Sequence, residues 1–154
     1  MSALHARMAH LLWLPLGVLL LSLLQLALWA ADRAPPFVLA SVMVSTAAPG
    51  RTVQLEALVR REISRRCSVH YTRQIFDGAG VRHDLEGEQY NSAEAIEHME
   101  RRNPGRLLLA IAISADARPG SAALVEARRY QCNPLHALWP IEVTTVMPFT
   151  IAAP

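Results

Sequence analysis

Residues 68–85 read SVHYTRQIFDGAGVRHDL, in which two runs of β-favouring residues flank a short segment with two glycines. The first run, Ser68–Phe76, is rich in the β-branched and aromatic residues that fit a pleated sheet surface. The segment Asp77–Gly80 supplies glycines, which permit the backbone angles of a tight turn. Because Val81–Leu85 then resumes the β-like character, this stretch predicts an antiparallel β-hairpin.

Runs of similar character on either side of the hairpin predict further strands. Residues 53–59 alternate between apolar and polar side chains except at Leu58, which is typical of a half-buried strand. Leu107–Ile113 is apolar on both faces and therefore predicts a central strand. In Ile141–Ile151 every second residue faces one side, and Pro148 favours an edge position or a bulge. The remaining expected strands are Phe37–Ser45 and Ala122–Cys132.

One segment, Ser92–Arg102, has the pattern of a helix. Asn91 and Glu94 have the spacing of a capping box, and Asn103-Pro104-Gly105 contains helix-stopping residues. A parallel sheet would need helices between its strands, and only this one is visible. The sequence therefore predicts an all-β domain over residues 37–154, an immunoglobulin-like antiparallel β-sandwich with one short crossing helix.

An uncharged apolar run, Leu11–Ala31, precedes this domain. About 20 such residues in a helix cross a bilayer core of about 30 Å. We therefore expect a cytoplasmic tail at residues 1–10, a transmembrane signal anchor at 11–31 and a linker at 32–36. A cleaved signal peptide is the alternative, but the run exceeds a usual apolar signal region, and Leu28 or Trp29 would occupy the −3 position of the cleavage site.

The charges that flank the apolar run predict its orientation. Arg7 precedes the run, whereas Asp32 and Arg33 cancel each other after it. The positive-inside rule then places the N-terminus in the cytoplasm and the C-terminal domain in the periplasm of a single-pass inner-membrane protein. The expected partners are the lipid bilayer and an unknown envelope protein.

Composition narrows the classes of function. All 15 basic residues are arginine and alanine is abundant, as in proteins from GC-rich bacterial or phage genomes. The formal net charge is only +2, and no basic stripe alternates with aromatics, which argues against a nucleic-acid partner. The densest basic cluster, Arg60, Arg61, Arg65 and Arg66, predicts a solvated strand end or loop.

No motif for catalysis or cofactor binding is present. His83, Asp84, Glu86 and Glu88 form an acidic cluster, but their spacing matches no calcium loop, so we expect a solvated loop there. We therefore predict no catalytic residues, no cofactor and no metal site.

Cys67 and Cys132 are the only cysteines. In an oxidising compartment they are expected to form a disulfide. Two free thiols are one alternative, and a zinc site completed by His70 and His136 is another. A separation of three residues on a strand points Cys67 and His70 to opposite faces, which disfavours zinc.

The segment Tyr130-x-Cys132 resembles the tyrosine corner and second cysteine of immunoglobulin-like domains, although no tryptophan lies between the cysteines. That resemblance implies a bridge between the two sheets. The stretches 130–134, 138–141 and 148–149 (YQCNP, LWPI and PF) also resemble small signal-anchored envelope proteins of phages and prophages. That resemblance covers the layout of the chain and implies no particular activity.

These features predict a membrane-anchored, non-enzymatic protein-interaction module. The expected contact site is the loop Asn133–Pro140, which carries His136, Leu138 and Trp139 outside any strand. The alternative for Trp139 is a structural role capping the core. Two other functions remain open: an accessory subunit that its transmembrane helix recruits to a larger complex, and a metal-dependent periplasmic enzyme.

Overall fold

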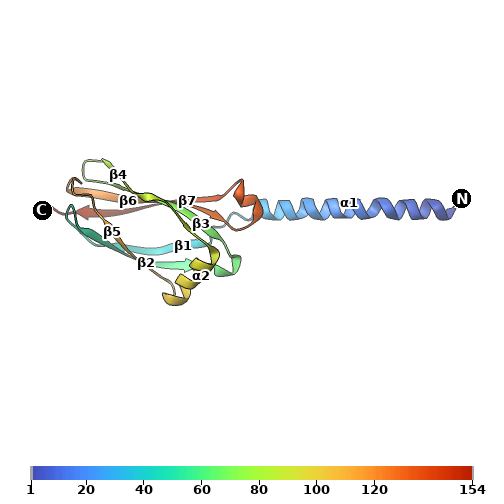
Figure 1. Cartoon of the computed structure of the whole chain (residues 1–154), viewed down its shortest axis with the longest axis horizontal. Helices are drawn as coiled ribbons and strands as arrows, with labels where there is room; N and C mark the ends of the chain where they lie inside the picture. The colour runs from blue at the N-terminus through green and yellow to red at the C-terminus, as the bar shows by residue number, and fades with distance from the viewer. Residues whose placement is uncertain (1, 154) are drawn as a thin grey trace. The chain divides into compact units, whose positions relative to one another are not determined.

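The computed structural model describes the backbone of residues 2–153 and the side chains of residues 13–85 and 87–153. The chain divides into two compact units, Met1–Arg33 and Ala34–Pro154, the second of which we call the head. The first unit is a single helix, α1 (Ser2–Ala31) (Figure 1). Its segment Trp13–Ala31 is long and apolar enough to cross a membrane, a property that signal sequences share. The predicted apolar helix is therefore present.

The head is built from two antiparallel sheets (Figure 1), so the predicted antiparallel β architecture is confirmed. The three-stranded sheet has the order β1-β2-β5, with β1 at Phe37–Val44, β2 at Thr52–Arg61 and β5 at Arg106–Ala112. The four-stranded sheet has the order β4-β3-β6-β7, with β3 at Ser68–Phe76, β4 at Arg82–Asn91, β6 at Gly120–Gln131 and β7 at Ile141–Ile151.

The main hydrophobic core lies between these sheets. Val53 and Leu55 of β2 pack in one cluster with Ile75, Leu124 and Ile151 of the four-stranded sheet. Each of these side chains is about 1% exposed. Burial of such a side chain stabilises the folded state by about 1.5–3 kcal/mol, so the inward-facing alternate residues hold the two sheets together.

Two expectations about strand positions have opposite outcomes. The prediction of an edge strand around Pro148 is confirmed, because β7 is the last strand of its sheet. The prediction that Leu107–Ile113 forms a central strand is wrong, because β5 is also an edge strand. The prediction assumed that apolar residues on both faces of the strand are buried on both faces. Leu108, on the outer face, is instead 60% exposed.

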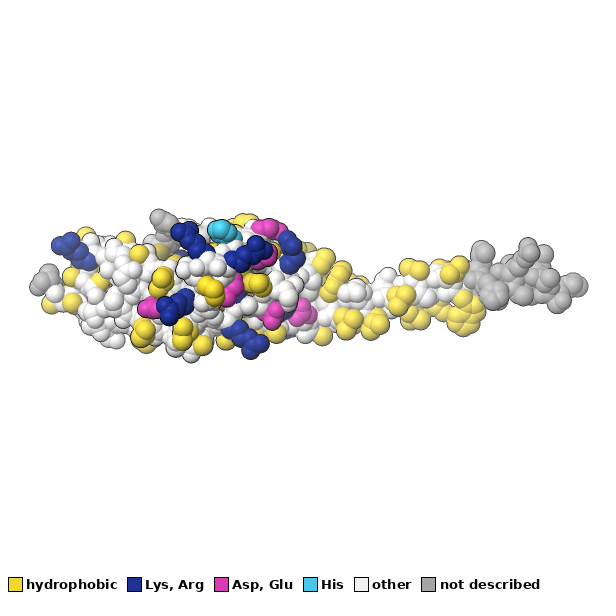
Figure 2. All heavy atoms as spheres, turned by 90° about the horizontal axis from the view of Figure 1, so that it is seen from below, with side chains coloured by type: hydrophobic (Ala, Val, Ile, Leu, Met, Phe, Trp, Pro, Cys, Tyr) yellow, Lys and Arg dark blue, Asp and Glu magenta, His cyan; other side chains and the backbone are white. Residues whose placement is uncertain are grey.

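The outer face of the three-stranded sheet carries exposed hydrophobic side chains, but not as one continuous patch. Glu56 pairs with both Met43 and Leu108, so a carboxylate separates the two apolar side chains. Figure 2 shows the corresponding mixture of hydrophobic, basic and acidic side chains over the head. Isolated exposed hydrophobic residues of this kind are ordinary on protein surfaces.

The predicted hairpin is present as β3 and β4, and its turn is held by Asp77. The carboxylate of Asp77 accepts hydrogen bonds from the backbone N–H groups of Ala79, Val81 and Arg118. Gly78 completes this packing, because a Cβ atom there would lie 2.1 Å from the carbonyl oxygen of Pro119. The turn is thereby fastened to the segment between β5 and β6.

The predicted helix is present as α2 (Ala93–Arg102), which connects β4 of one sheet to β5 of the other. The capping residue is Ser92 and not Asn91, because the Ser92 hydroxyl accepts a hydrogen bond from the N–H of Ala95 at 3.2 Å. No residue of α2 is fully buried. The helix therefore lies on the surface and covers the side of the head where it crosses between the sheets.

Cys67 and Cys132 form a disulfide, so neither sulfur is available to complete a zinc site. The expectation that this bridge joins the two sheets is wrong. Strands β3 and β6 are neighbours in one sheet, and Ser68 pairs with Gln131 at their ends. The cysteines are the next residues along this register, so the disulfide closes the end of one strand pair.

Candidate functional site

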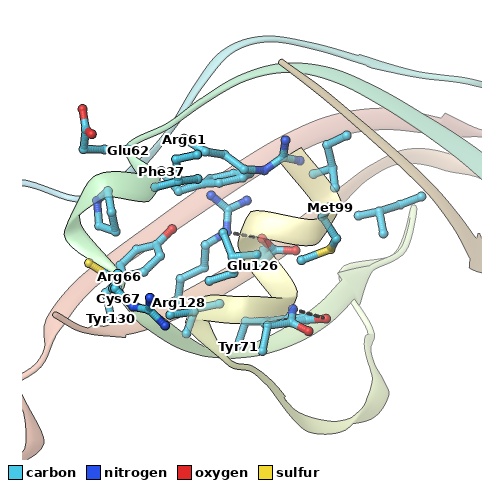
Figure 3. Close-up of a pocket in the computed structure, with 18 of the residues that line it drawn as sticks. Phe37, Arg61, Glu62, Arg66, Cys67, Tyr71, Met99, Glu126, Arg128 and Tyr130 are labelled. Carbon is cyan, nitrogen blue, oxygen red and sulfur yellow. Dashed lines mark hydrogen bonds and ion pairs between the residues drawn. The ribbon is translucent and has the colours of Figure 1, made fainter. Parts of the chain in front are cut away.

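A cavity of about 120 Å³ lies between the two sheets beside α2 (Figure 3). Its apolar wall comes from both sheets and from the helix. The residues of this wall include Val69, Ile96, Met99, Leu107 and Leu109. Three aromatic rings, those of Phe37, Tyr71 and Tyr130, also line it.

Buried charges interrupt this apolar lining on the inner face of the four-stranded sheet. Arg73 of β3 lies directly opposite Glu126 of β6. The Nε atoms of Arg73 and Arg128 donate to separate oxygens of the Glu126 carboxylate. Glu126 is 2% exposed and Arg128 5% exposed, so these three residues form a charged cluster inside the head.

Two arginine side chains lie over the aromatic ring of Phe37. The guanidinium carbon of Arg128 lies 4.5 Å from the centre of the Phe37 ring, and that of Arg61 lies 5.3 Å from the same centre. Both distances fall within the range of cation–π attraction. The Arg61 side chain is only 4% exposed, so the expectation of a solvated cluster at residues 60–66 is wrong for this residue.

Two ion pairs connect α2 to the edge of the cavity. Arg61 pairs with Glu100 near the end of the helix and also donates to the carbonyl oxygen of Arg106 at 2.9 Å. Arg66 pairs with Glu94 in the first turn at 2.5 Å, and both of these side chains are about two-thirds exposed. The exposed pair contributes about 0–1 kcal/mol, whereas the Arg61–Glu100 pair is largely shielded from water.

The charges in the interior do not balance. Among the described side chains, Arg61, Arg73 and Arg128 face two carboxylates, Glu100 and Glu126, which leaves an excess of one positive charge. The remaining charged residues at the cavity, Glu62 and Arg66, lie at its exposed rim, where water screens them. The interior therefore favours an anion.

The Tyr130 hydroxyl faces this interior and, among the described residues, has no hydrogen-bond partner. A tyrosine corner would donate this hydroxyl to a backbone carbonyl, so the resemblance to that motif does not hold. Burial raises the pKa of the Tyr130 hydroxyl, and the positive charge and N–H groups of the nearby Arg128 side chain partly oppose this shift. The group remains a protonated donor at neutral pH.

The structure separates the three residues of the expected contact loop. His136 is fully buried, and its Nδ1 accepts a hydrogen bond from the backbone N–H of Cys132 at 3.2 Å. The expectation that His136 is a contact residue is therefore wrong, because its ring supports the loop from inside. Leu138 is 87% exposed and Trp139 55% exposed, so both present apolar surface to the surroundings.

The acidic segment after the hairpin turn belongs to strand β4, so the expectation of a loop there is wrong. His83 lies 3.2 Å from the Asp77 carboxylate, and His70 lies 3.6 Å from Glu88, while the side chain of Glu86 is outside the described residues. No three histidine, cysteine, aspartate or glutamate residues within the described part of the chain cluster as a metal ion requires.

Sequence reasoning missed the charged cluster, although a signal was present. Glu126 and Arg128 have the same parity along β6 as Leu124 and Tyr130, which face the core. Charged residues at inward positions are rare unless they are paired. Their position in the apolar alternation was therefore the sign of a buried ionic cluster.

No protein-family model matches the chain, and no curated protein matches it either.

Proposed function

We propose that the protein is a membrane-anchored, non-enzymatic interaction module, with α1 as an uncleaved anchor and the head outside the cytoplasm. The proposed setting is the bacterial envelope, in a protein of the phage or prophage type. In this proposal Leu138 and Trp139 contact a protein partner.

The strand order supports an immunoglobulin-like head. In the constant-type immunoglobulin fold, the first, second, fourth and fifth strands share one sheet, and the third, sixth and seventh share the other. The head has the same arrangement except that its fourth strand, β4, lies beside β3 in the second sheet. A seven-stranded sandwich with a switched fourth strand describes this topology.

The presentation of Leu138 and Trp139 is the observation that carries the functional proposal. Both follow the short helix η2 (Pro134–Ala137), which begins beside the disulfide. The side chain of Asn133 caps this helix by accepting from the His136 N–H at 3.2 Å, and the buried ring of His136 anchors it. An exposed apolar pair on a supported turn loses little conformational freedom on binding, which favours affinity for a protein surface.

Site-specific photo-crosslinking in the full chain, in its own membrane, tests this function. A photoreactive phenylalanine analogue at Leu138 should give a discrete protein adduct. The matched control is Val146, which is 60% exposed on β7 and should give none. Adducts to lipid alone would identify the loop as a membrane contact and contradict the proposal, as would equal labelling at both positions.

A further inference from the structure

We propose that the cavity beneath α2 is a binding site for a small monocarboxylate with a compact apolar body. This site is separate from the Leu138–Trp139 loop. It is suggested by a cavity that combines apolar walls, one excess positive charge and an unsatisfied hydroxyl.

The Tyr130 hydroxyl is the first of these features. The residue is 2% exposed, and its O–H group has no hydrogen-bond acceptor among the described residues, although its oxygen lies close to the Arg128 guanidinium. Figure 3 shows the ring among the residues that line the cavity, with its oxygen directed inward. A buried donor without an acceptor destabilises the folded protein, so a ligand that accepts its hydrogen bond recovers that free energy.

Arg128 supplies the second feature. Its Nε–H is donated to Glu126, and the guanidinium carries four other N–H groups. Glu126 already interacts with both Arg73 and Arg128, so one carboxylate neutralises only one of the two cations. A single ligand carboxylate balances the remaining charge and suits the planar donor geometry of arginine.

The walls and volume limit the rest of the ligand. Leu107, Leu109, Ile96 and Met99 offer no polar groups from their side chains, so the body of the ligand must be apolar. An apolar cavity of about 150 Å³ holds benzene, and this one, at about 120 Å³, is somewhat smaller. The apolar body of the ligand must therefore be smaller than a benzene ring. The isobutyl group of isovalerate, with four carbon atoms, meets this limit, and its carboxylate belongs at the charged side of the cavity.

Thermal unfolding and calorimetric titration of the full chain in detergent micelles test this site. The probes are isovalerate and its neutral analogue isovaleramide, with sodium chloride added to equalise ionic strength. Isovalerate should raise the unfolding temperature in proportion to the logarithm of its concentration above Kd. Isovaleramide should have little effect, because it cannot balance the excess charge.

Two variants make the result specific to the cavity. Tyr130→Phe removes only the hydroxyl and should weaken isovalerate binding about tenfold without lowering the unfolding temperature of the ligand-free protein. Leu109→Phe should fill the cavity and abolish binding. The control is Tyr90→Phe, which changes a tyrosine that is 57% exposed and should bind isovalerate normally.

Three outcomes would overturn the proposal. Equal stabilisation by isovalerate and isovaleramide would show that charge is not recognised. An unchanged isovalerate Kd in Tyr130→Phe would remove the hydroxyl from the site. Absence of any isovalerate binding to the unsubstituted protein would show that the cavity does not take this class of ligand.

Discussion

Arg73 and Glu126 face each other across neighbouring strands, and both side chains point into the head. Removing charges from water costs several kcal/mol for each ion, so such a cluster adds little net stability compared with apolar packing. Each charged residue nevertheless depends on the others, because the loss of one leaves a buried charge without its counterion. The cluster divides the interior, with the large apolar core on one side and the smaller cluster around Tyr130 on the other.

Replacing the shared carboxylate should destabilise the head strongly. Glu126→Gln leaves Arg73 and Arg128 without their counterion, and we expect a loss of about 3–5 kcal/mol in the free energy of unfolding. Chemical denaturation of the full chain in micelles measures this loss. The control is Glu142→Gln, which removes an exposed pair with Arg129 and should cost less than about 1 kcal/mol. Similar losses for the two variants would mean that Glu126 is solvated.

The Asp77 turn should make the stability of the head depend on pH in the acid range. The N–H of Arg118, followed by the hydrogen bonds from His83, Val81 and Ala79, holds the pKa of the Asp77 carboxyl well below its ordinary value. In acid the unfolded chain therefore binds a proton more readily at Asp77. The contribution of the Asp77 carboxylate to the stability of the head is complete above the pKa of about 4 in the unfolded chain. It declines as the pH falls towards the pKa in the folded chain.

Asp77→Asn tests this dependence. The unfolding temperature of the variant should be clearly lower than that of the unsubstituted protein at pH 6, and the difference should narrow as the pH is lowered below about 4. Asp84→Asn serves as the control, because that carboxylate is exposed and pairs only with Arg82 among the described residues. A difference for Asp77→Asn that stays constant with pH would contradict the role of its charge.

The disulfide should contribute substantially to stability. Cys67 and Cys132 are 65 positions apart, and closing a loop of this length stabilises the folded chain by roughly 4 kcal/mol in the chain-entropy model. The double variant Cys67→Ala and Cys132→Ala should unfold at a correspondingly lower denaturant concentration. Mass analysis without reductant should show the loss of two hydrogens. Two thiols that react freely in the native protein would refute the bridge.

The N-terminal helix allows a separate test of the proposed topology. If α1 is an uncleaved anchor, the protein should resist carbonate extraction, and a reporter fused after Pro154 should be active outside the cytoplasm. A mature N-terminus close to Asp32 would identify α1 as a signal sequence instead. Replacing α1 with an unrelated transmembrane helix should preserve crosslinking from position 138, because the proposal places recognition in the head.

Local sequence patterns predicted most of the elements. The bounds of β3 and β7 agree with the apolar and β-branched runs at 68–76 and 141–151, because burial on one face produces a period of two. The helix was recognisable from its composition, although its cap lies one residue later than the spacing suggested. The sheet position of Leu107–Ile113 was not predictable, since outward leucines look the same in an edge strand and a central strand.

Pairing between distant segments was beyond the reach of the same patterns. Nothing local reveals that β3 and β6 are neighbours, so the disulfide was expected to join the two sheets, whereas it joins two strands of one sheet. The cavity was missed for a related reason, because Arg61 and Arg73 come from strands in different sheets. Only the three-dimensional register brings these groups around one space.

The Leu138–Trp139 loop permits a prediction in which binding and stability separate. Replacing Leu138 and Trp139 with alanine should eliminate the protein adduct formed from a photoreactive group at position 137, while the unfolding temperature stays within a few degrees of normal. Both side chains are more than half exposed, so their loss leaves little unfilled space in the core. His136→Ala, in contrast, should lower the stability of the head. It removes a fully buried ring and leaves the N–H of Cys132 without its acceptor. An unsatisfied buried donor of this kind costs about 1–3 kcal/mol, so this variant should unfold at a lower temperature. If the double substitution unfolds the head instead, Trp139 belongs to the core and the proposed contact site is wrong.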